Sequence, residues 1–239
     1  MERARPGWFE YQVEAELTYE FLRSGAQAVA YSSIVAGGPN ACVLHYRDNN
    51  RQLLDGELLL IDAGCEYHGY ASDITRTFPV NGRFSGPQKA IYEIVLAAQE
   101  ACLDAVKPGA DFHDYHKVAE RVLAQGYIDV GLCKGSLSEV LENGSYKQFY
   151  MHRAGHWLGM DVHDAGPYQV KGASQKLAPG MVLTVEPGTY IRPADNVPVE
   201  FWDIGVRIED DVLVTPTGIE NLTVAAPKSV ADVEAATRR

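Results

Sequence analysis

Four acidic residues of this chain stand in or beside apolar, β-branched segments, where a carboxylate is costly to bury. They are Asp62 in LLLIDAG, Asp73 in ASDITRTF, Glu186 in LTVEPGTY and Glu209 in VRIEDD. Carboxylates are almost never fully buried without a partner, and two of them about 4 Å apart repel by roughly 4 kcal/mol at an effective dielectric near 20. If the four converge, cations must hold them together. The pattern therefore predicts a two-metal hydrolase.

Histidines in one segment narrow the kind of metal site. The segment HRAGHWLGMDVHD carries His156 and His163. Oxygen-rich sites with one imidazole suit Mn²⁺, Co²⁺, Fe²⁺ or Zn²⁺ and differ from thiolate-bound structural zinc. A zinc-binding HExxH helix is rejected, because Arg153 stands where the glutamate between His152 and His156 would be. The glycines around His156 also disfavour a regular helix.

Each acid has an ordinary explanation when it is taken alone. Asp62 and Glu186 can simply end strands, and Asp73 can cap a turn. Glu209 opens the acidic triplet EDD, which is usually a solvated hairpin. A histidine among so many carboxylates favours the metal site over these alternatives.

Composition excludes several classes of function. The chain has 239 residues, of which 46% are hydrophobic, enough for a large core in one or two domains. Its net charge of −11 and the lack of any run of Lys or Arg argue against a nucleic-acid partner. The four cysteines form no CxxC pair, so we expect reduced thiols in a cytoplasmic protein. Because the start of the sequence has no apolar core and no run approaches 18 apolar residues, we expect neither a signal peptide nor a membrane span.

The pattern of the remaining chain is typical of mixed α and β structure. Apolar residues recur every four positions over 9–21 and predict a helix that ends at Gly25. The capping sequence SGPQ opens a second helix, which ends before Pro108; a third is capped by Asp111 and ends at Gly126. The segments predicted as strands are AVAY, CVLHY, ELLLIDAG, ITRTFPV, MVLTVEPGTYI and GVRIEDDVLVT.

A weak internal repeat relates the two halves of the chain. In the first half a strand ends at Asp62 and a second strand carries Asp73; in the second half Glu186 and Glu209 stand in the same relation. Two strand pairs that each present two carboxylates can close one site between them. Chance similarity of two acid-bearing strand pairs is the alternative.

Longer blocks of sequence resemble a known peptidase family. IDAGCEYHGYASDITRTFPV, HWLGMDVHDAG, GMVLTVEPGTYI and GVRIEDDVLVT resemble the Xaa-Pro aminopeptidases (aminopeptidase P) in order and spacing along essentially the whole chain. The resemblance implies the pita-bread fold: an α+β domain over residues 1–239, with two pseudo-symmetric halves, a mostly antiparallel curved sheet and outer helices. Prolidase shares nearly the same blocks. Methionine aminopeptidase shares the metal ligands, but VRIEDD with Arg207 looks unlike it.

The resemblance also implies a role for individual residues. The residues that match the family's metal ligands are Asp62, Asp73, His156, Glu186 and Glu209. Asp73 and Glu209 would bridge two divalent ions, most simply Mn²⁺, with Co²⁺, Zn²⁺ or Fe²⁺ as alternatives. The residues that match catalytic groups are His163, Glu186 and His45, and those that match the pocket for proline and the residues after it are His152, Tyr190 and Arg207.

These roles imply hydrolysis of the N-terminal Xaa-Pro bond of peptides with proline at the second position. A hydroxide that bridges the ions would attack, Glu186 would pass its proton to the leaving nitrogen, and His163 would stabilise the oxyanion. The non-enzymatic alternative is a pita-bread module that only binds peptides. Intact ligands favour catalysis, whereas Arg153 and Ala154 depart from the glycine and the larger apolar residue expected beside His152.

Full-length members of the family carry a further N-terminal domain, which we expect to be absent from this chain. Trp8 and Phe9 are then candidates for an exposed apolar patch, which predicts either a homo-oligomer formed through this end or a more open site that discriminates Xaa-Pro peptides less well. Alternatively, both rings fold back onto the core of the domain.

Overall fold

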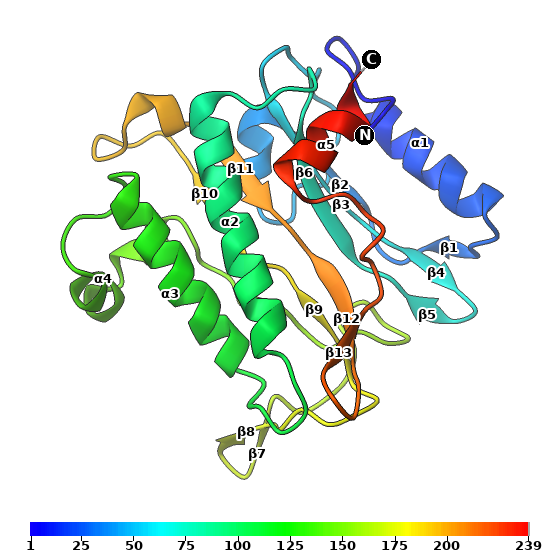
Figure 1. Ribbon diagram of the computed structural model, residues 1–239. Coiled ribbons are helices and arrows are strands. Elements are labelled where there is room, and N and C mark those ends of the chain that lie inside the picture. The colour runs from blue at the N-terminus through cyan, green and yellow to red at the C-terminus, as the bar shows by residue number, and fades with distance from the viewer. Residues whose placement is uncertain (239) are drawn as a thin grey trace.

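A computed structural model of the chain describes residues 1–238, which form an α+β structure (Figure 1). The helices are α1 (Glu10–Arg23), α2 (Gly86–Ala105), α3 (Asp114–Asp129), α4 (Leu137–Asn143) and α5 (Val230–Thr237), with short 3-10 turns at η1 (Gly38–Cys42), η2 (Ser145–Gln148) and η3 (Val199–Phe201). The strands are β1 (Ala28–Val29), β2 (Ile34–Gly37), β3 (Leu58–Ala63), β4 (Cys65–Tyr67), β5 (Tyr70–Ala71), β6 (Ile74–Pro79), β7 (Gln169–Val170), β8 (Ala173–Ser174), β9 (Val182–Val185), β10 (Gly188–Ile191), β11 (Ile204–Arg207), β12 (Asp210–Val214) and β13 (Ile219–Asn221). Within the described part of the chain, no helix is both long and apolar enough to cross a membrane.

All the strand pairs are antiparallel, and the pairing is divided over several small sheets. Two of these sheets carry the four acids: β2–β3–β6 in the first half and β13–β12–β9 in the second. In the first sheet Asp62 pairs with Thr75, so Asp73, directly before β6, lies at the same end of the pair as Asp62. In the second sheet Asp210 pairs with Val185, so Glu186 and Glu209 also share one end. The predicted acid-bearing strand pairs are therefore present in both halves.

Hydrogen bonds join the two halves at the ends that bear the acids. The Glu209 amide donates to the Thr75 carbonyl oxygen at 3.1 Å. Thr77 exchanges two hydrogen bonds with the backbone of Arg207, through its hydroxyl group. β6 of the first half thus lies against β11 and the start of β12, and the two pairs of carboxylates face one region.

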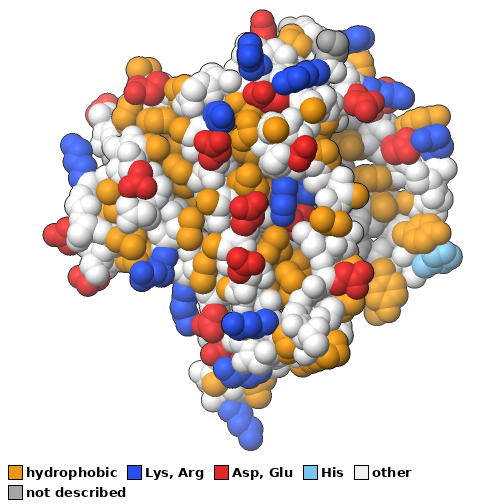
Figure 2. All heavy atoms as spheres, viewed as in Figure 1, with side chains coloured by type: hydrophobic (Ala, Val, Ile, Leu, Met, Phe, Trp, Pro, Cys, Tyr) orange, Lys and Arg blue, Asp and Glu red, His pale blue; other side chains and the backbone are white. Residues whose placement is uncertain are grey.

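Helices α2 and α3 pack side by side on one side of the strands (Figure 1). The start of α2 follows from its sequence, because the Ser85 hydroxyl accepts from the Gln88 amide and the Gln88 side chain accepts from the Ser85 amide. Its buried face includes Ile91, Val95 and Cys102, which join the main core. On the surface over α2, acidic and basic side chains are interspersed (Figure 2).

The predicted ends of α3 are wrong, and tertiary contacts explain both errors. Asp111 is not the cap, because it lies in an extended bridge with Lys176 and the helix begins only at Asp114. Gly126 does not end the helix. It lies within α3, where a Cβ atom would stand 2.5 Å from a methyl carbon of Ile94. Because glycine has no side chain, α2 and α3 can approach closely at this point.

The segment CVLHY, predicted as a strand, is also an error. Its first residue ends η1 and the others form a turn that leads into an extended loop. The completely buried Glu10 carboxylate explains this course, since it accepts hydrogen bonds from four groups of this region. The donors are the Gly37 amide at 2.8 Å, the Asn40 side chain at 3.0 Å, the Tyr46 hydroxyl at 2.7 Å and the Arg51 amide at 2.8 Å.

The aromatic rings at the start of the chain are half-buried. Trp8 packs against the main core, and the Arg5 guanidinium carbon lies 4.9 Å from its ring centroid. Phe9 stacks on Tyr11 with ring centroids 5.3 Å apart. The self-association expected through this end stays a prediction, and the partial burial of Trp8 and Phe9 removes part of its basis.

Candidate metal centre

A cavity of about 290 Å³ lies where the two halves meet, and all ten residues singled out from the sequence line it. They are His45, Asp62, Asp73, His152, His156, His163, Glu186, Tyr190, Arg207 and Glu209. The fold therefore brings together residues spread over most of the chain.

The tightest group in this cavity consists of Asp73, His156 and Glu209. One potential ligand atom from each lies within 4.8 Å of the others. His156 Nε2 lies 3.3 Å from a carboxylate oxygen of Asp73 and 3.7 Å from one of Glu186. An imidazole among several carboxylate oxygens is a donor set suited to a hard or borderline divalent ion. These residues therefore fit a metal.

The segment that carries His156 runs beside β9 and contains no helix, as expected when the HExxH helix was rejected. The His156 amide donates to the Thr184 hydroxyl at 3.1 Å, and the Thr184 amide donates to the His156 carbonyl oxygen at 3.0 Å. A Cβ atom at Gly155 would stand 2.0 Å from the Thr184 carbonyl oxygen, so only glycine permits this approach. Because Thr184 lies two residues before Glu186, these bonds position His156 and Glu186 on the same side of the site.

One hydrogen bond sets the tautomer of His156. Its Nδ1 lies 2.9 Å from the Trp157 carbonyl oxygen, which can only accept, so Nδ1 carries a proton. Nε2 is the atom that faces Asp73 and Glu186. This arrangement is typical of histidine ligands, which donate their other ring nitrogen to a carbonyl or carboxylate group.

Asp62 has partners of its own at the edge of this group. The Arg207 guanidinium lies 2.6 Å from one of its oxygens, and the Tyr31 hydroxyl donates to the other at 2.6 Å. The same hydroxyl contacts Asp73. Tyr31 therefore sits between two of the proposed ligands.

Sequence reasoning missed two residues that contact the acids. Thr75 donates to Glu209 at 2.6 Å, and it could have been found, since it follows Asp73 by two positions and shares its face of the strand. Tyr31 follows the short strand β1 without any local signal. Only the tertiary structure brings it to the acids.

Burial raises the pKa values of the central carboxyl groups and so favours their uncharged forms. It raises the pKa of Asp73, raises that of Glu209 well above its ordinary value, and raises that of Glu186 to about 8. For His156 burial acts to lower the pKa, but the hydrogen bond with Asp73 and the charge of Glu186 outweigh it and raise the pKa to about 9. Ionisation of all these carboxyl groups together is therefore unfavourable in the metal-free site, and bound cations would compensate their charge.

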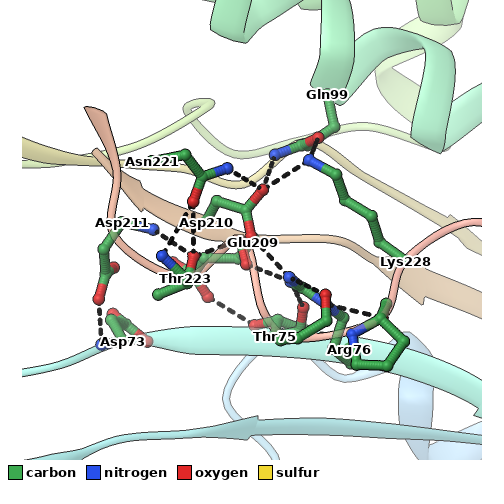
Figure 3. A network of polar contacts seen from close by, with 12 residues as sticks. Asp73, Thr75, Arg76, Gln99, Glu209, Asp210, Asp211, Asn221, Thr223 and Lys228 are labelled. Atoms are coloured by element: carbon green, nitrogen blue, oxygen red, sulfur yellow. Dashed lines mark hydrogen bonds and ion pairs between the residues drawn. The ribbon is translucent and has the colours of Figure 1, made fainter. Parts of the chain in front are cut away.

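A polar network behind Glu209 rules out the solvated-hairpin alternative, because the whole acidic triplet is buried (Figure 3). Asp210 accepts from Arg76 at 2.6 Å and from Lys228 at 2.7 Å. Gln99, Asn221 and Thr223 also donate to its carboxylate, each at 2.9 Å. The network attaches β12 to β6, α2 and the segment before α5.

Asp211 supports the site from the same side (Figure 3). One of its carboxyl oxygens accepts from the Asp73 amide at 3.0 Å. Its other oxygen is buried and has no hydrogen-bond partner among the described residues. Burial raises the pKa of Asp211 to about 8.

The residues predicted to bind substrate form a connected row in the cavity. The Tyr190 hydroxyl lies 2.8 Å from both His152 Nε2 and an Arg207 nitrogen. Burial and the nearby charge of Arg207 lower the pKa of His152 to about 3, so this ring is neutral. Its Nδ1 lies 2.7 Å from the Arg153 carbonyl oxygen, which can only accept, so in the neutral ring Nε2 is the acceptor for the Tyr190 hydroxyl.

The two residues predicted to act near the scissile bond are both exposed and belong to different loops. The His163 ring stands edge-on to His156, with centroids 4.3 Å apart, and burial followed by the charge of His156 lowers its pKa. His45 is exposed and lies on the loop after η1. Both line the cavity.

Comparison with known proteins agrees with this geometry. Residues 1–216 match metallopeptidase family M24. The chain is 50% identical to the Xaa-Pro aminopeptidase of Haemophilus influenzae and 48% identical to that of Escherichia coli, in each case over 98% of this chain. It covers 54% and 53% of those proteins, so the chain spans about half the length of the curated relatives that it matches.

Solved structures agree with the sequence comparison. The fold matches aminopeptidase PepP of Pseudomonas aeruginosa with a TM-score of 0.97 and 56% identity, over 98% of this chain and 53% of that one. It matches proline aminopeptidase P II of Yersinia pestis with a TM-score of 0.95 and 50% identity, over 98% and 54% of the two chains. The expected pita-bread fold is confirmed. The chain belongs to metallopeptidase family M24.

Proposed function

We propose that this chain is the catalytic part of a metalloaminopeptidase that hydrolyses the N-terminal Xaa-Pro bond of peptides. The observation that carries the proposal is the meeting of four carboxylates and His156 in one cavity, with His163 beside them. The relatives named Xaa-Pro aminopeptidase support this choice of substrate.

The metal ligands in this proposal are Asp62, Asp73, His156, Glu186 and Glu209. Asp73 and Glu209, which lie in the tightest group, would each contact both of two divalent ions. Two divalent ions carry a charge of +4, which balances the four carboxylates. When bound, they supply Lewis acidity and lower the pKa of water, so that hydroxide is available as the nucleophile at neutral pH. We propose Mn²⁺ as the metal.

Glu186 would transfer the proton of the reaction. The leaving proline nitrogen belongs to a tertiary amide and must be protonated before it can depart. Glu186, which lines the cavity beside His156, would accept the proton of the attacking water and deliver it to this nitrogen. His163, neutral because its pKa is lowered, would donate a hydrogen bond to the developing oxyanion, with His45 near the same bond.

The remaining cavity residues account for substrate orientation. The free amine of the peptide needs an acidic neighbour, which Asp62 and Glu209 can provide. The row formed by His152, Tyr190 and Arg207 would contact proline and the residues after it. An amine held by the ligands places the first peptide bond at the metals, which explains trimming from the N-terminus. We also propose a cytoplasmic location, which the four unpaired cysteines support.

A panel of three peptides tests the proposal. Purified chain with added Mn²⁺ is incubated with an Xaa-Pro dipeptide, an Xaa-Pro-Yaa tripeptide and a Met-Ala peptide, and release of the first residue is followed. We expect cleavage of the tripeptide. Cleavage of the dipeptide alone would identify a prolidase, and cleavage of the Met-Ala peptide alone a methionine aminopeptidase. Bound metal and bound peptide without cleavage would favour a binding module.

A further inference from the structure

The charges that line the cavity are divided between its interior and its rim. The four carboxylates converge in the interior, where Arg207 is already paired with Asp62. Two more arginines, Arg47 and Arg153, line the same cavity but are exposed. Among the described residues, neither of them forms an ion pair. The rim thus carries two guanidinium groups with which no acid of the described chain is paired.

Aromatic rings hold the Arg153 guanidinium at this rim. Its central carbon lies 5.5 Å from the centroid of the Tyr168 ring, which also lines the cavity. Tyr168 in turn stacks on Trp157 with centroids 5.9 Å apart and meets the edge of Phe112 at 4.9 Å. Because Trp157 and Phe112 belong to the main core, the ring under Arg153 is firmly placed. Stacking of this kind orients a guanidinium while leaving its N–H groups free.

The backbone at Arg153 is tied to the substrate side of the cavity as well. His152 Nδ1 lies 2.7 Å from the Arg153 carbonyl oxygen, while His152 Nε2 contacts Tyr190. Arg153 therefore continues the row of His152, Tyr190 and Arg207 outwards to the rim. A ligand that leaves the interior along this row meets Arg153.

We propose that Arg153, stacked on Tyr168, binds a carboxylate of the substrate beyond the scissile bond, with Arg47 as a second cation. This inference rests on the proposed aminopeptidase function and names the preferred class of substrate. The carboxylate is either the free C-terminus of a short peptide or an acidic side chain that follows proline. A guanidinium fork matches a carboxylate in two-point geometry, which a lysine cannot reproduce. The cavity thus suits a peptide with its amine in the interior and its negative charge at the rim.

Matched peptide pairs test this inference. Ala-Pro-Ala is compared with Ala-Pro-Ala-amide, and Ala-Pro-Glu-amide with Ala-Pro-Gln-amide, in the Mn²⁺-loaded chain. We expect KM to be about 5- to 20-fold lower for at least one carboxylate-bearing member, as for a charge-assisted hydrogen-bonded pair. The pair that shows the difference identifies whether the C-terminus or the side chain is recognised.

Three variants separate recognition from general effects. In Arg153→Gln we expect the ratio of KM values within the pair to fall to near one, and in Arg153→Lys to fall part of the way. Arg83→Gln is the control, since it removes the same charge from an exposed arginine that does not line the cavity, and the ratio should persist. Equal KM values for both members of each pair in the unaltered chain would overturn the inference, as would an unchanged ratio in Arg153→Gln.

Peptide binding separates this inference from the proposed function. In Glu186→Gln, in which hydrolysis is blocked, the same peptides are titrated by calorimetry with Mn²⁺ present, alone and combined with Arg153→Gln. Tighter binding of the carboxylate-bearing peptides that depends on Arg153 supports the inference even if the unaltered chain cleaves none of them. Cleavage of all four peptides with no preference in KM or in affinity leaves the proposed function standing and overturns the inference.

Discussion

At the scale of single residues, the buried acids have very different sets of partners. Asp62 already has a cationic partner in Arg207, whereas the hydrogen bond to the Glu209 carboxylate found among residues 1–238 comes from the neutral hydroxyl of Thr75. Asp73 contacts Tyr31 and His156. Burial is the largest influence on Asp73 and Glu209 and raises the pKa of both. A divalent ion would compensate the charge of both carboxylates.

Substitution of these two acids should affect metal content more than it affects folding. We expect Asp73→Asn and Glu209→Gln each to lower the occupancy of both ions, because each residue would contact both. His163→Ala should keep its metal and lower kcat by about 10²- to 10³-fold, the loss typical of one oxyanion donor. Elemental analysis and steady-state kinetics measure these effects. Two full equivalents of metal in Asp73→Asn, or metal loss in His163→Ala, would contradict the assignment.

Metal binding should release protons near neutral pH. The pKa of Glu186 is raised to about 8 and that of His156 to about 9, so below these values the metal-free groups hold protons that ligands must lose. Affinity should therefore rise as the pH increases from 6 towards 9. Calorimetry in buffers of different ionisation enthalpy measures the release. A binding enthalpy that is the same in all buffers at pH 7 would contradict it.

At the scale of elements, strand pairing positions the four acids, and the buried Glu10 carboxylate positions the loop after η1. Antiparallel pairing of β3 with β6 and of β9 with β12 puts two acids at one end of each pair. Glu10, at the start of α1, gathers donors from the segment between β2 and Arg51. His45 and Arg47 belong to that segment and line the cavity. Glu10 thus links the first helix to one wall of the site.

Loss of the Glu10 charge should destabilise the fold. Glu10→Gln replaces an acceptor oxygen by a donor and leaves buried donors unsatisfied, so we expect a loss on the order of 3 kcal/mol in the free energy of unfolding. Tyr46→Phe removes one of the four donors and should cost about 1 kcal/mol. Glu100→Gln, at an exposed position of α2, is the control and should change stability by less than about 0.5 kcal/mol. Urea unfolding measures all three, and equal stability of Glu10→Gln and the control would refute this role.

At the scale of the whole molecule, the site is the place where the two halves meet. Asp62 and Asp73 come from the first half, and His156, Glu186 and Glu209 from the second. Bonds such as that from the Glu209 amide to Thr75 join the halves, and the Asp210 network braces them from behind. A metal ion held by residues of both halves would therefore stabilise the complete fold.

Divalent metal should raise the unfolding temperature of the chain. An ion at about 100 times its Kd adds about 2.7 kcal/mol, which corresponds to about 5–10 °C for a chain of this size. Calorimetric scans with Mn²⁺, and again after addition of a chelator, measure this shift. Asp73→Asn should lose most of it. A Tm that does not respond to Mn²⁺ would argue against a metal site in this cavity.

Local signals predicted some elements well and failed where long-range contacts decide. The start of α2 was predictable because Ser85 and Gln88 satisfy each other within one turn. Asp111 looked like a similar cap, but the backbone beside it is already paired with the segment around Lys176, over 60 residues away in sequence. The turn in CVLHY depends in the same way on Glu10.

The sequence by itself determined the chemical nature of the site, because carboxylates within apolar strands need compensating charge wherever they lie. It also determined which end of each strand pair bears the acids, since alternation and short turns are local properties. Only the tertiary structure decided that Tyr31 lies between Asp62 and Asp73, that Asp210 and Asp211 are buried, and that Arg153 stacks on Tyr168. These contacts join segments far apart in the chain or depend on how the core orients a ring, and no local pattern encodes such distances.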